Sequence, residues 1–363
     1  MSSSTALPSW LRLALISGIG GETQRKLLTF FGSPEAIFSA SRLSLREVIG
    51  EKRVNLLLDS DNAEAVSAAC NWAIGCDQHI ITLADPDYPK LLLEIPDPPT
   101  LLYVRGRLDL LNRPTLAVVG SRNPTPQGLQ NAERFAAALA ESGLVIASGL
   151  ALGIDAAAHR GALSVAGSTI AFVGTGIDRI YPARNRELAL EIGTRGAIVS
   201  EFPLGTPVAS ANFPRRNRLI SGVSLGVLVV EAANESGSLI TSRLACEQGR
   251  EVFAIPGSIH SPVSRGCHKL IKQGAKLVET AQDVLEELSW NKSVPSVDPI
   301  STKPDPEFDQ LLSFLGFDPC SLDELGLRSG LLMDTLSVSL LALELDGRIA
   351  SLPGGYYQRI SKI

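Results

Sequence analysis

The stretch TLAVVGSRNPTPQGLQNAERFAAALAESGLVIASG, residues 115–149, contains one complete structural unit. Its apolar run at 115–119 predicts a buried strand, 126–142 predicts a helix, and 144–147 predicts a second buried strand. Both strands are continuously apolar, and a helix separates them. Such strands are typical of a parallel sheet that is covered on both faces.

The same alternation continues to about residue 290. Further strands are predicted at 169–173, 197–200, 225–231 and 252–255, and further helices at 153–166, 185–192, 216–221, 238–248 and 281–288. We therefore expect the α/β class, with a doubly wound, Rossmann-like parallel sheet within residues 76–290. The Pro-rich stretch 85–111 is predicted to be irregular and to lead into this domain.

Two smaller domains are predicted on either side of the sheet domain. Residues 1–75 alternate apolar helical stretches with glycine breaks and predict a small all-α domain. In it, ISGIGG at 16–21 is either a plain helix–helix connection or a helix-hairpin-helix turn that offers backbone N–H groups to a phosphate. Residues 291–304 are a Pro/Ser-rich linker. Residues 305–363 predict a winged helix.

The winged-helix prediction rests on three helices and a hairpin. The helices are expected at 307–315, 321–327 and 333–345. The hairpin follows in RIASLPGGYYQRI, where Gly354 and Gly355 suit a two-residue turn with positive φ.

Charge is distributed unevenly along the chain. The net charge is -5, but residues 112–276 carry 17 Lys/Arg against 11 Asp/Glu, which gives +6 and leaves -11 for the remainder. A basic central domain favours a polyanionic ligand, although ordinary surface charge would explain it too. The five cysteines form no CxxC pair, and no signal peptide or run of about 18 apolar residues is present. We expect a cytoplasmic protein without a membrane segment.

The glycine-rich loops after the strands exclude several kinds of chemistry. The loops VVGSRNPTPQG, ASGLALGID, FVGTGIDRIYP and NESGSLIT include no G-x-G-x-x-G and no Gly-Lys-Ser/Thr, which gives dinucleotide or ATP binding little support. No G-x-S-x-G elbow is present. His260, Cys267 and His268 are close in sequence but lack a second pair of ligands. We expect no catalytic residues, no metal and no cofactor, and we interpret His159 as a packing or capping residue.

The loops also carry arginines, and ANFPRRNRLISG at 211–222 adds an aromatic ring to them. Because Pro214 disfavours a helical conformation at the residue before it, we expect Phe213 to be extended at the mouth of the next helix. Its ring is then a surface on which a base stacks, or it packs in the core. The nearby arginines contact phosphates, or some of them form internal salt bridges. They are Arg122, Arg184, Arg186, Arg215, Arg216 and Arg218.

At these loops the sequence resembles the DNA-processing protein A family (DprA, also called Smf). The resemblance is carried, in order, by VVGSRNPTPQG, IASGLALGIDAAAHRGAL, TIAFVGTGIDRIYPARN, SEFPLG, the long run from NFPRRNRLISG to VFAIPGSI, and SRGCHKLIKQGA. It covers most of residues 115–276. It implies a cytoplasmic homodimer that binds and protects single-stranded DNA and loads the RecA recombinase onto it during natural transformation. It also implies an N-terminal domain like a SAM or helix-hairpin-helix module and a C-terminal winged helix.

The resemblance also implies a set of DNA-binding residues. Gly120, Ser121, Arg122, Phe213, Arg216 and Asn217 match the family's DNA pocket, and Ser236, Gly237, Ser238 and Thr241 are expected to contact phosphate. Ser148 and Gly149, in the ASGLALGID loop, complete the set together with Arg184 and Arg215. Two positions where the family often has lysine are Ser210 and Ala183 here. Arg184 and Arg215 are candidates to replace that charge.

Two other functions compete with DNA binding as interpretations of the sequence. The sheet domain also resembles the LOG-type nucleoside monophosphate phosphoribohydrolases, but NESGSLIT lacks their P-G-G-x-G-T-x-x-E pattern. A double-strand transcription factor would rest on the winged helix, but MDTLSVSLLALELDG has no Lys or Arg and three acids. Phosphates would repel such a helix. We interpret the tail as a protein-contact or regulatory module.

Overall fold

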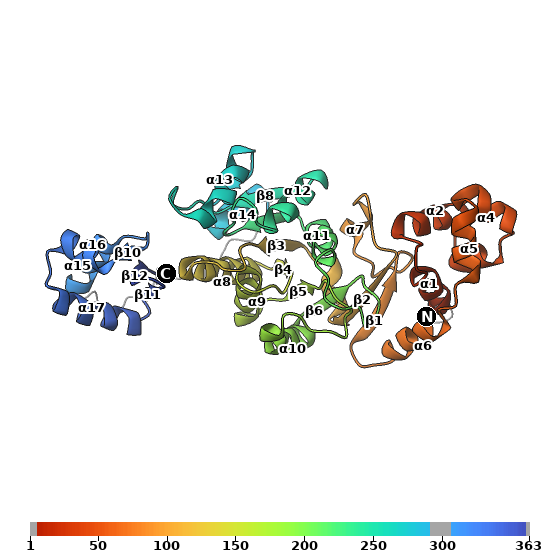
Figure 1. Ribbon diagram of the computed structural model, residues 1–363, viewed down its shortest axis with the longest axis horizontal. Helices are drawn as coiled ribbons and strands as arrows, with labels where there is room; N and C mark the ends of the chain where they lie inside the picture. The colour runs from red at the N-terminus through yellow and green to blue at the C-terminus, as the bar shows by residue number, and fades with distance from the viewer. Residues whose placement is uncertain (1–5, 291–305, 361–363) are drawn as a thin grey trace.

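A computed structural model describes residues 6–290 and 306–360 of the chain, and its centre is a nine-stranded sheet (Figure 1). The predicted linker at 291–304 lies outside the described residues. Across the sheet the order is β1 (Gln78–Thr82), β2 (Leu101–Gly106), β6 (Ala197–Ser200), β5 (Thr169–Phe172), β4 (Val145–Ser148), β3 (Thr115–Val119), β7 (Gly226–Val229), β8 (Glu251–Ala254) and β9 (Lys276–Leu277). From β6 to β9 all neighbours are parallel. The expected α/β class with a doubly wound sheet is therefore confirmed.

The prediction of an irregular stretch at 85–111 was wrong. It contains helix α7 (Lys90–Leu93), strand β2 and the 3-10 helix η1 (Leu108–Asn112). β2 pairs antiparallel with both β1 and β6. Its residues are almost all buried, so sheet pairing satisfies backbone groups that would otherwise lack partners. The Pro-rich segment only precedes this strand, and the sheet is mixed at this edge.

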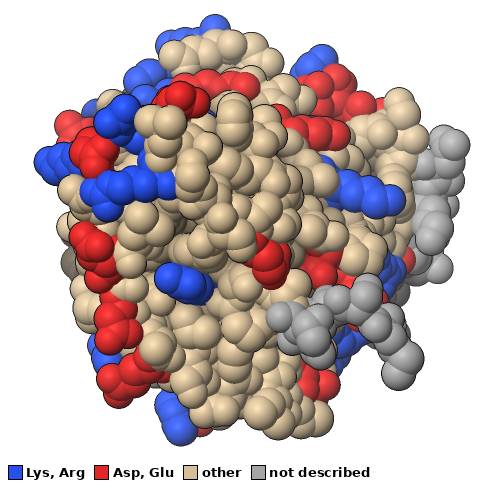
Figure 2. Space-filling view, turned by 90° about the vertical axis from the view of Figure 1, so that its right-hand side faces the viewer, with Lys and Arg blue, Asp and Glu red and all other residues tan. Residues whose placement is uncertain are grey.

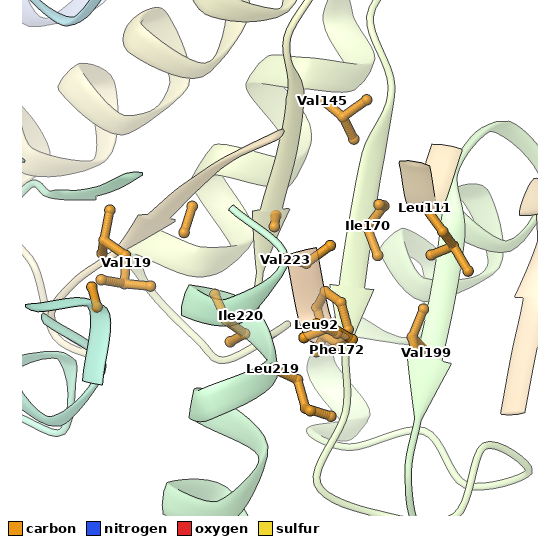
Figure 3. Packing of buried hydrophobic residues seen from close by; sticks show 14 of the residues in the cluster. Leu92, Leu111, Val119, Val145, Ile170, Phe172, Val199, Leu219, Ile220 and Val223 are labelled. Carbon is orange, nitrogen blue, oxygen red and sulfur yellow. The ribbon is translucent and has the colours of Figure 1, made fainter. Parts of the chain in front are cut away.

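Helices cover both faces of the sheet. One face packs against α8 (Pro126–Glu141), α9 (Ile154–Ser164), α10 (Arg186–Arg195) and α14 (Ala281–Glu287). The other packs against α7, α11 (Asn212–Gly222), α12 (Ser238–Glu247) and α13 (Arg265–Lys272). In Figure 3, Leu219 and Ile220 of α11, and Val223 just after it, point into the core that also holds Val119 and Phe172. This buried face fixes the rotation of α11, and with it the direction of its arginines.

The N-terminal helices form a small core of their own and lie at the β1–β2 edge of the sheet (Figure 1). They are α1 (Leu7–Ala14), α2 (Gly21–Phe31), α3 (Pro34–Ser39), α4 (Arg42–Ile49) and α5 (Glu51–Asp59). The next helix, α6 (Ala63–Trp72), packs against the sheet instead. Leu11 and Ala69 share a cluster with Tyr103 of β2, and the rings of Trp72 and Tyr103 meet edge to face at 5.7 Å. Apolar contact therefore ties this helical unit to the sheet.

The C-terminal residues form the expected winged helix. Its elements are α15 (Pro306–Leu315), β10 (Cys320–Ser321), α16 (Leu322–Ser329), α17 (Met333–Leu345), β11 (Ile349–Leu352) and β12 (Tyr356–Arg359). Gly354 and Gly355 have φ of 88° and 77°, which confirms the glycine turn of the hairpin. Within residues 6–290 and 306–360, no single helix is long and apolar enough to cross a membrane. The bent pair α16–α17 meets that test of length and composition only when the two helices are joined.

Candidate functional site

A pocket of about 590 Å³ lies where the strand order of the sheet reverses. β3 is the first strand of the parallel part, β4 adds on one side of it and β7 on the other, and such switch points are where open α/β sheets bind ligands. The loops after β3 and β7 and the start of α11 form its walls; we call it the switch-point pocket. Ten of the predicted residues line it: Gly120, Ser121, Arg122, Phe213, Arg216, Asn217, Ser236, Gly237, Ser238 and Thr241.

The loop after β3 requires glycine at its first position. A Cβ on Gly120 would lie 2.7 Å from the side chain of Ile154 and 2.9 Å from the carbonyl oxygen of Glu231. The N–H of Ser121 donates to that same carbonyl at 2.7 Å. The chain is therefore held tightly between α9 and the end of β7, and this holds the exposed Arg122 at the rim of the pocket.

The ring of Phe213 is half-buried beside Arg122 at the rim. A Cβ on Gly174 would lie 3.0 Å from this ring, and the ring of Tyr181 is 5.9 Å away between centroids. The guanidinium of Arg122 lies 5.5 Å from the Phe213 centroid. The ring is supported from behind by other groups while part of it stays exposed to the pocket. This environment differs from that of the fully buried core phenylalanines Phe172 and Phe253.

The expectation that Phe213 is extended was wrong. α11 begins at Asn212, so Phe213 lies in the first helical turn, and the predicted start at 216 was too late. Proline is tolerated there because the N–H that Pro214 lacks would have no partner within the helix. Asn212 also donates its side-chain amide to the carbonyl oxygen of Gly174 at 3.0 Å, which anchors the turn.

Arg216 forms the floor of the pocket and is only 4% exposed. Its guanidinium donates to the carbonyl oxygens of Gly149, at 2.6 Å, and Phe172, and to the side-chain oxygen of Asn217 at 3.1 Å. Burial lowers the pKa of Arg216 to about 10, which still leaves it charged at neutral pH. Its hydrogen bonds to the backbone make it a rigid positive charge beneath the pocket.

Sequence reasoning missed the nearby carboxylate of Asp155, which also lines the pocket. It accepts hydrogen bonds from the N–H groups of Gly149 at 3.1 Å and Ala151 at 3.4 Å. Burial raises the pKa of Asp155, and the positive charge of Arg216 opposes that shift. An acidic residue in the first turn of a buried, alanine-rich helix was the available signal. Glu235 and the ring of Tyr181 were missed as well.

The loop after β7 supplies a helix N-terminus to the same pocket. The hydroxyl oxygens of Ser236 and Ser238 lie 2.7 Å apart, and α12 begins at Ser238. Its N-cap, Gly237, has no side chain with which to cap the helix. The N–H of Ser238 donates to the hydroxyl oxygen of Ser236 at 3.4 Å, and the next two N–H groups donate to the carbonyl oxygens of Ser236 and Gly237. The positive end of the helix dipole still favours an anion here.

Four predicted residues are not among those that line the pocket. Ser148 is buried and donates to the carbonyl oxygen of Val118 at 2.7 Å, so its hydroxyl is committed within the sheet. Gly149 lies behind Arg216, where a Cβ would meet the guanidinium at 2.5 Å. Arg184 is exposed in the 3-10 turn η2 (Ala183–Asn185).

Arg215 is the fourth of these residues, and it points to the other side of α11. Its guanidinium lies 3.1 Å from the carboxylate of Glu201 and 5.3 Å from the ring centroid of Phe202. Arg218 pairs with the same carboxylate at 2.5 Å. Arg215 and Arg218 therefore form the internal salt bridges that the sequence left open as an alternative to phosphate contacts. Ser210, at one of the family's lysine positions, lines the pocket as a neutral residue.

The other candidate groups are engaged elsewhere. His268 Nε2 lies 2.9 Å from the carbonyl oxygen of Gly257. Burial raises the pKa of the Cys267 thiol to about 12, which keeps it protonated. Nδ1 of the buried His159 lies 2.7 Å from the hydroxyl of Thr169, in agreement with a packing role. In the part of the chain that the structure describes, no three His, Cys, Asp or Glu residues gather as metal ligands would.

Comparison with known protein families and relatives gives consistent matches. The family model of the DNA recombination-mediator protein A matches residues 79–289, and that of the DprA winged helix domain matches residues 295–355. Protein Smf of Escherichia coli (strain K12) is 41% identical over 361 residues, which cover 96% of this chain and 94% of that protein. The DNA processing protein DprA of Streptococcus pneumoniae is 50% identical over 209 residues, covering 58% of this chain and 74% of that protein.

Solved structures agree with these matches. The X-ray structure of DNA processing protein A from Streptococcus pneumoniae superposes with a TM-score of 0.69 at 40% identity, covering 77% of this chain and 97% of that one. A structure of the same protein from Helicobacter pylori, which concerns its single-stranded DNA binding mode, superposes with a TM-score of 0.54 at 33% identity. It covers 59% of this chain and 98% of that one.

Proposed function

Since the chain belongs to the DNA recombination-mediator protein A family, we propose that it is a DNA-processing protein that holds single-stranded DNA in the switch-point pocket. One observation carries the proposal. A half-exposed ring, Phe213, faces a pocket that also presents the guanidinium of Arg122 and the positive N-terminal end of α12. An aromatic surface beside cationic groups is how proteins hold single strands without reading their sequence.

Each group has a distinct part in this account. A base stacks on Phe213, because every base has a π-face. The exposed Arg122 pairs with a phosphate, and the positive end of the α12 dipole, with the hydroxyls of Ser236 and Ser238, attracts a second phosphate oxygen. Arg216 holds the floor of the pocket in place and adds positive charge from below. We propose no catalytic step and no cofactor for this site.

Duplex DNA should bind less well than a single strand. In a duplex the bases are paired and stacked on one another, so none is free to lie on Phe213. The phosphate contacts alone would then give only weak, sequence-independent attraction. A preference for single strands is therefore the mark of the proposed site.

The family resemblance supports three further proposals. The protein protects incoming single strands during natural transformation, it loads the RecA recombinase onto them, and it acts as a homodimer in the cytoplasm. These rest on the resemblance rather than on the geometry of the pocket.

The proposal is tested by the affinities for a single-stranded and a duplex oligonucleotide of equal length across a salt series. Tighter single-strand binding, with log K falling by about 0.7 per neutralised phosphate for each unit of log salt, supports it. Equal affinity for the two, or an affinity independent of salt, contradicts it.

A further inference from the structure

A second and larger cavity, of about 890 Å³, lies between the N-terminal helices and the sheet domain. We call it the interdomain groove. Its walls are the turn 16–21 before α2, the segment 96–101, the loop 201–203 and the side of α11 that carries Arg215 and Arg218. The ISGIGG turn and two arginines of α11, Arg215 and Arg218, therefore lie together outside the switch-point pocket.

The groove contains polar groups whose bonding is incomplete within the described residues. The Glu201 side chain is 2% exposed; its Oε2 accepts from Arg215 and Arg218, but its Oε1 has no hydrogen-bond partner. The hydroxyl of Tyr103, 1% exposed, has no partner either. Leaving such groups unsatisfied is costly, and buried polar groups are rarely unpaired. Both residues line the groove, but their free atoms are covered by neighbouring groups, so a ligand with a hydrogen-bond donor and an acceptor would complete them once those groups move aside.

The opposite wall of the groove holds a helix N-terminus, whose first turn also carries Glu22, paired with Lys26 at 2.7 Å. α2, 11 residues long, begins at Gly21, and its N-cap Gly20 contributes no side chain. A Cβ on Gly20 would meet nothing within 4 Å, so the helix N-terminus is open. Arg25 lines the same wall and pairs with Asp97 at 2.6 Å. Figure 2, which faces this end of the molecule, shows acidic and basic side chains interspersed over the surface.

The groove also lies next to the proposed DNA site. Phe213 faces the switch-point pocket, and Arg215, two residues later on the same helix, faces the groove. The exposed Pro214 lies between them at the start of α11. A strand that leaves the first pocket across this turn therefore arrives at the groove.

We propose that the interdomain groove is a second nucleotide site, with a phosphate on the N-terminus of α2 and a base against Tyr103 and Glu201. A phosphate matches the open N–H groups, and a base supplies the missing N–H donor and acceptor. The proposal rests on the function proposed above, since the nucleotide belongs to the strand held in the switch-point pocket. A free nucleoside monophosphate has the same chemistry, and the experiment separates the two sources.

Gly20→Asp tests the phosphate end of the groove. Gly20 has φ -78° and ψ 169°, which aspartate adopts readily, and aspartate is a favoured N-cap. The substitution therefore supports α2 but puts a carboxylate where the phosphate would lie. Ser41→Asp is the matched control, because it adds the same charge at the N-cap of α4, outside the groove.

Tyr103→Phe tests the base end. A hydroxyl without a partner contributes nothing to the fold, so its loss should leave thermal stability unchanged or raised. A drop in DNA affinity would then come from a lost contact to the ligand.

Affinities are measured for oligothymidylates of about 4 to about 16 nucleotides and, separately, for thymidine monophosphate. We expect Gly20→Asp and Tyr103→Phe to weaken binding of the longest strand about three- to tenfold, with the shortest strand and Ser41→Asp unaffected. If only thymidine monophosphate binding is lost, the site stands and its ligand is the free nucleotide. If both variants match Ser41→Asp in both assays, the second site is excluded. Arg122→Ala, measured alongside, reports on the first pocket independently, and its failure to weaken any strand would contradict the proposed function instead.

Discussion

The guanidinium of Arg122, from the loop after β3, lies 5.5 Å from the ring centroid of Phe213 on α11. This relationship joins two segments that are far apart in the sequence, and it places an exposed charge beside an aromatic face. In the free protein the cation–π contact keeps the two groups together at the mouth of the pocket. In the bound state a base and a phosphate would replace it.

Arg122→Ala should weaken single-strand binding by about 10- to 150-fold, since one charge-assisted hydrogen bond is lost. The slope of log K against log salt should become shallower by about 0.7, because one phosphate is no longer neutralised. Thermal stability should stay close to that of the parent. Arg160→Ala is the control, because Arg160 is also exposed but pairs with Glu133 elsewhere on the surface. A large loss of stability in Arg122→Ala would show instead that this residue is structural.

Phe213→Ala should weaken single-strand binding by about 5- to 150-fold, which corresponds to about 1–3 kcal/mol of stacking. Phe213→Tyr and Phe213→Trp should keep most of the affinity, since any aromatic face stacks. Because the ring is half-buried, the alanine variant should lose clearly less stability than the about 3–5 kcal/mol of a buried phenylalanine. If Phe213→Ala binds single strands as tightly as the parent does, the ring does not stack on a base.

Arg216→Ala should destabilise the fold, by about 3–5 kcal/mol, because it leaves Asp155 without its compensating charge. The difference in the free energy of unfolding between the variant and the parent should become smaller as pH falls. Burial already raises the pKa of Asp155 above its unfolded value, and removing Arg216 raises it further, so acid protonates the carboxyl in the folded variant and relieves the unpaired charge. Chemical unfolding at several pH values measures this, and Asp155→Asn in the same chain should recover part of the loss. A difference in unfolding free energy that does not change with pH would contradict the electrostatic coupling between Asp155 and Arg216.

Incubation with nucleoside monophosphates, ATP or single-stranded DNA should yield no released base, phosphate or fragments. The carboxylate of Asp155 at the pocket floor is committed to backbone N–H groups and to the charge of Arg216. Chromatography of the reaction mixture measures whether base, phosphate or DNA fragments are released. Turnover that is abolished by changing Ser238 or Thr241 would revive the phosphoribohydrolase alternative.

The sequence predicted the parallel part of the sheet well, because strands buried on both faces read as short apolar runs between helices. It failed at β2, where the prolines just before Leu101 concealed an apolar strand that pairs with β6. It also misplaced the start of α11. A proline in the first helical turn looks the same in sequence as a proline just before a helix.

The candidate site shows what a sequence leaves open. The sequence alone does not distinguish the roles of Arg215, Arg216 and Arg218. In a helix, however, successive side chains differ by about 100° in direction. Burial of Leu219 and Ile220 against the sheet sends Arg216 to the floor of the switch-point pocket and Arg215 to the opposite side. The role of each arginine in DNA binding stays a prediction.

The most direct test of the central claim is one titration: fluorescence anisotropy of a labelled single strand and of the matching duplex, with the parent protein and Phe213→Ala, across a salt series. The account predicts that the parent prefers the single strand at every salt concentration. It also predicts that Phe213→Ala loses most of that preference while keeping the salt slope, because stacking is removed and the phosphate contacts remain. A parent protein that binds both forms equally, or a Phe213→Ala variant that keeps the full preference, would contradict it.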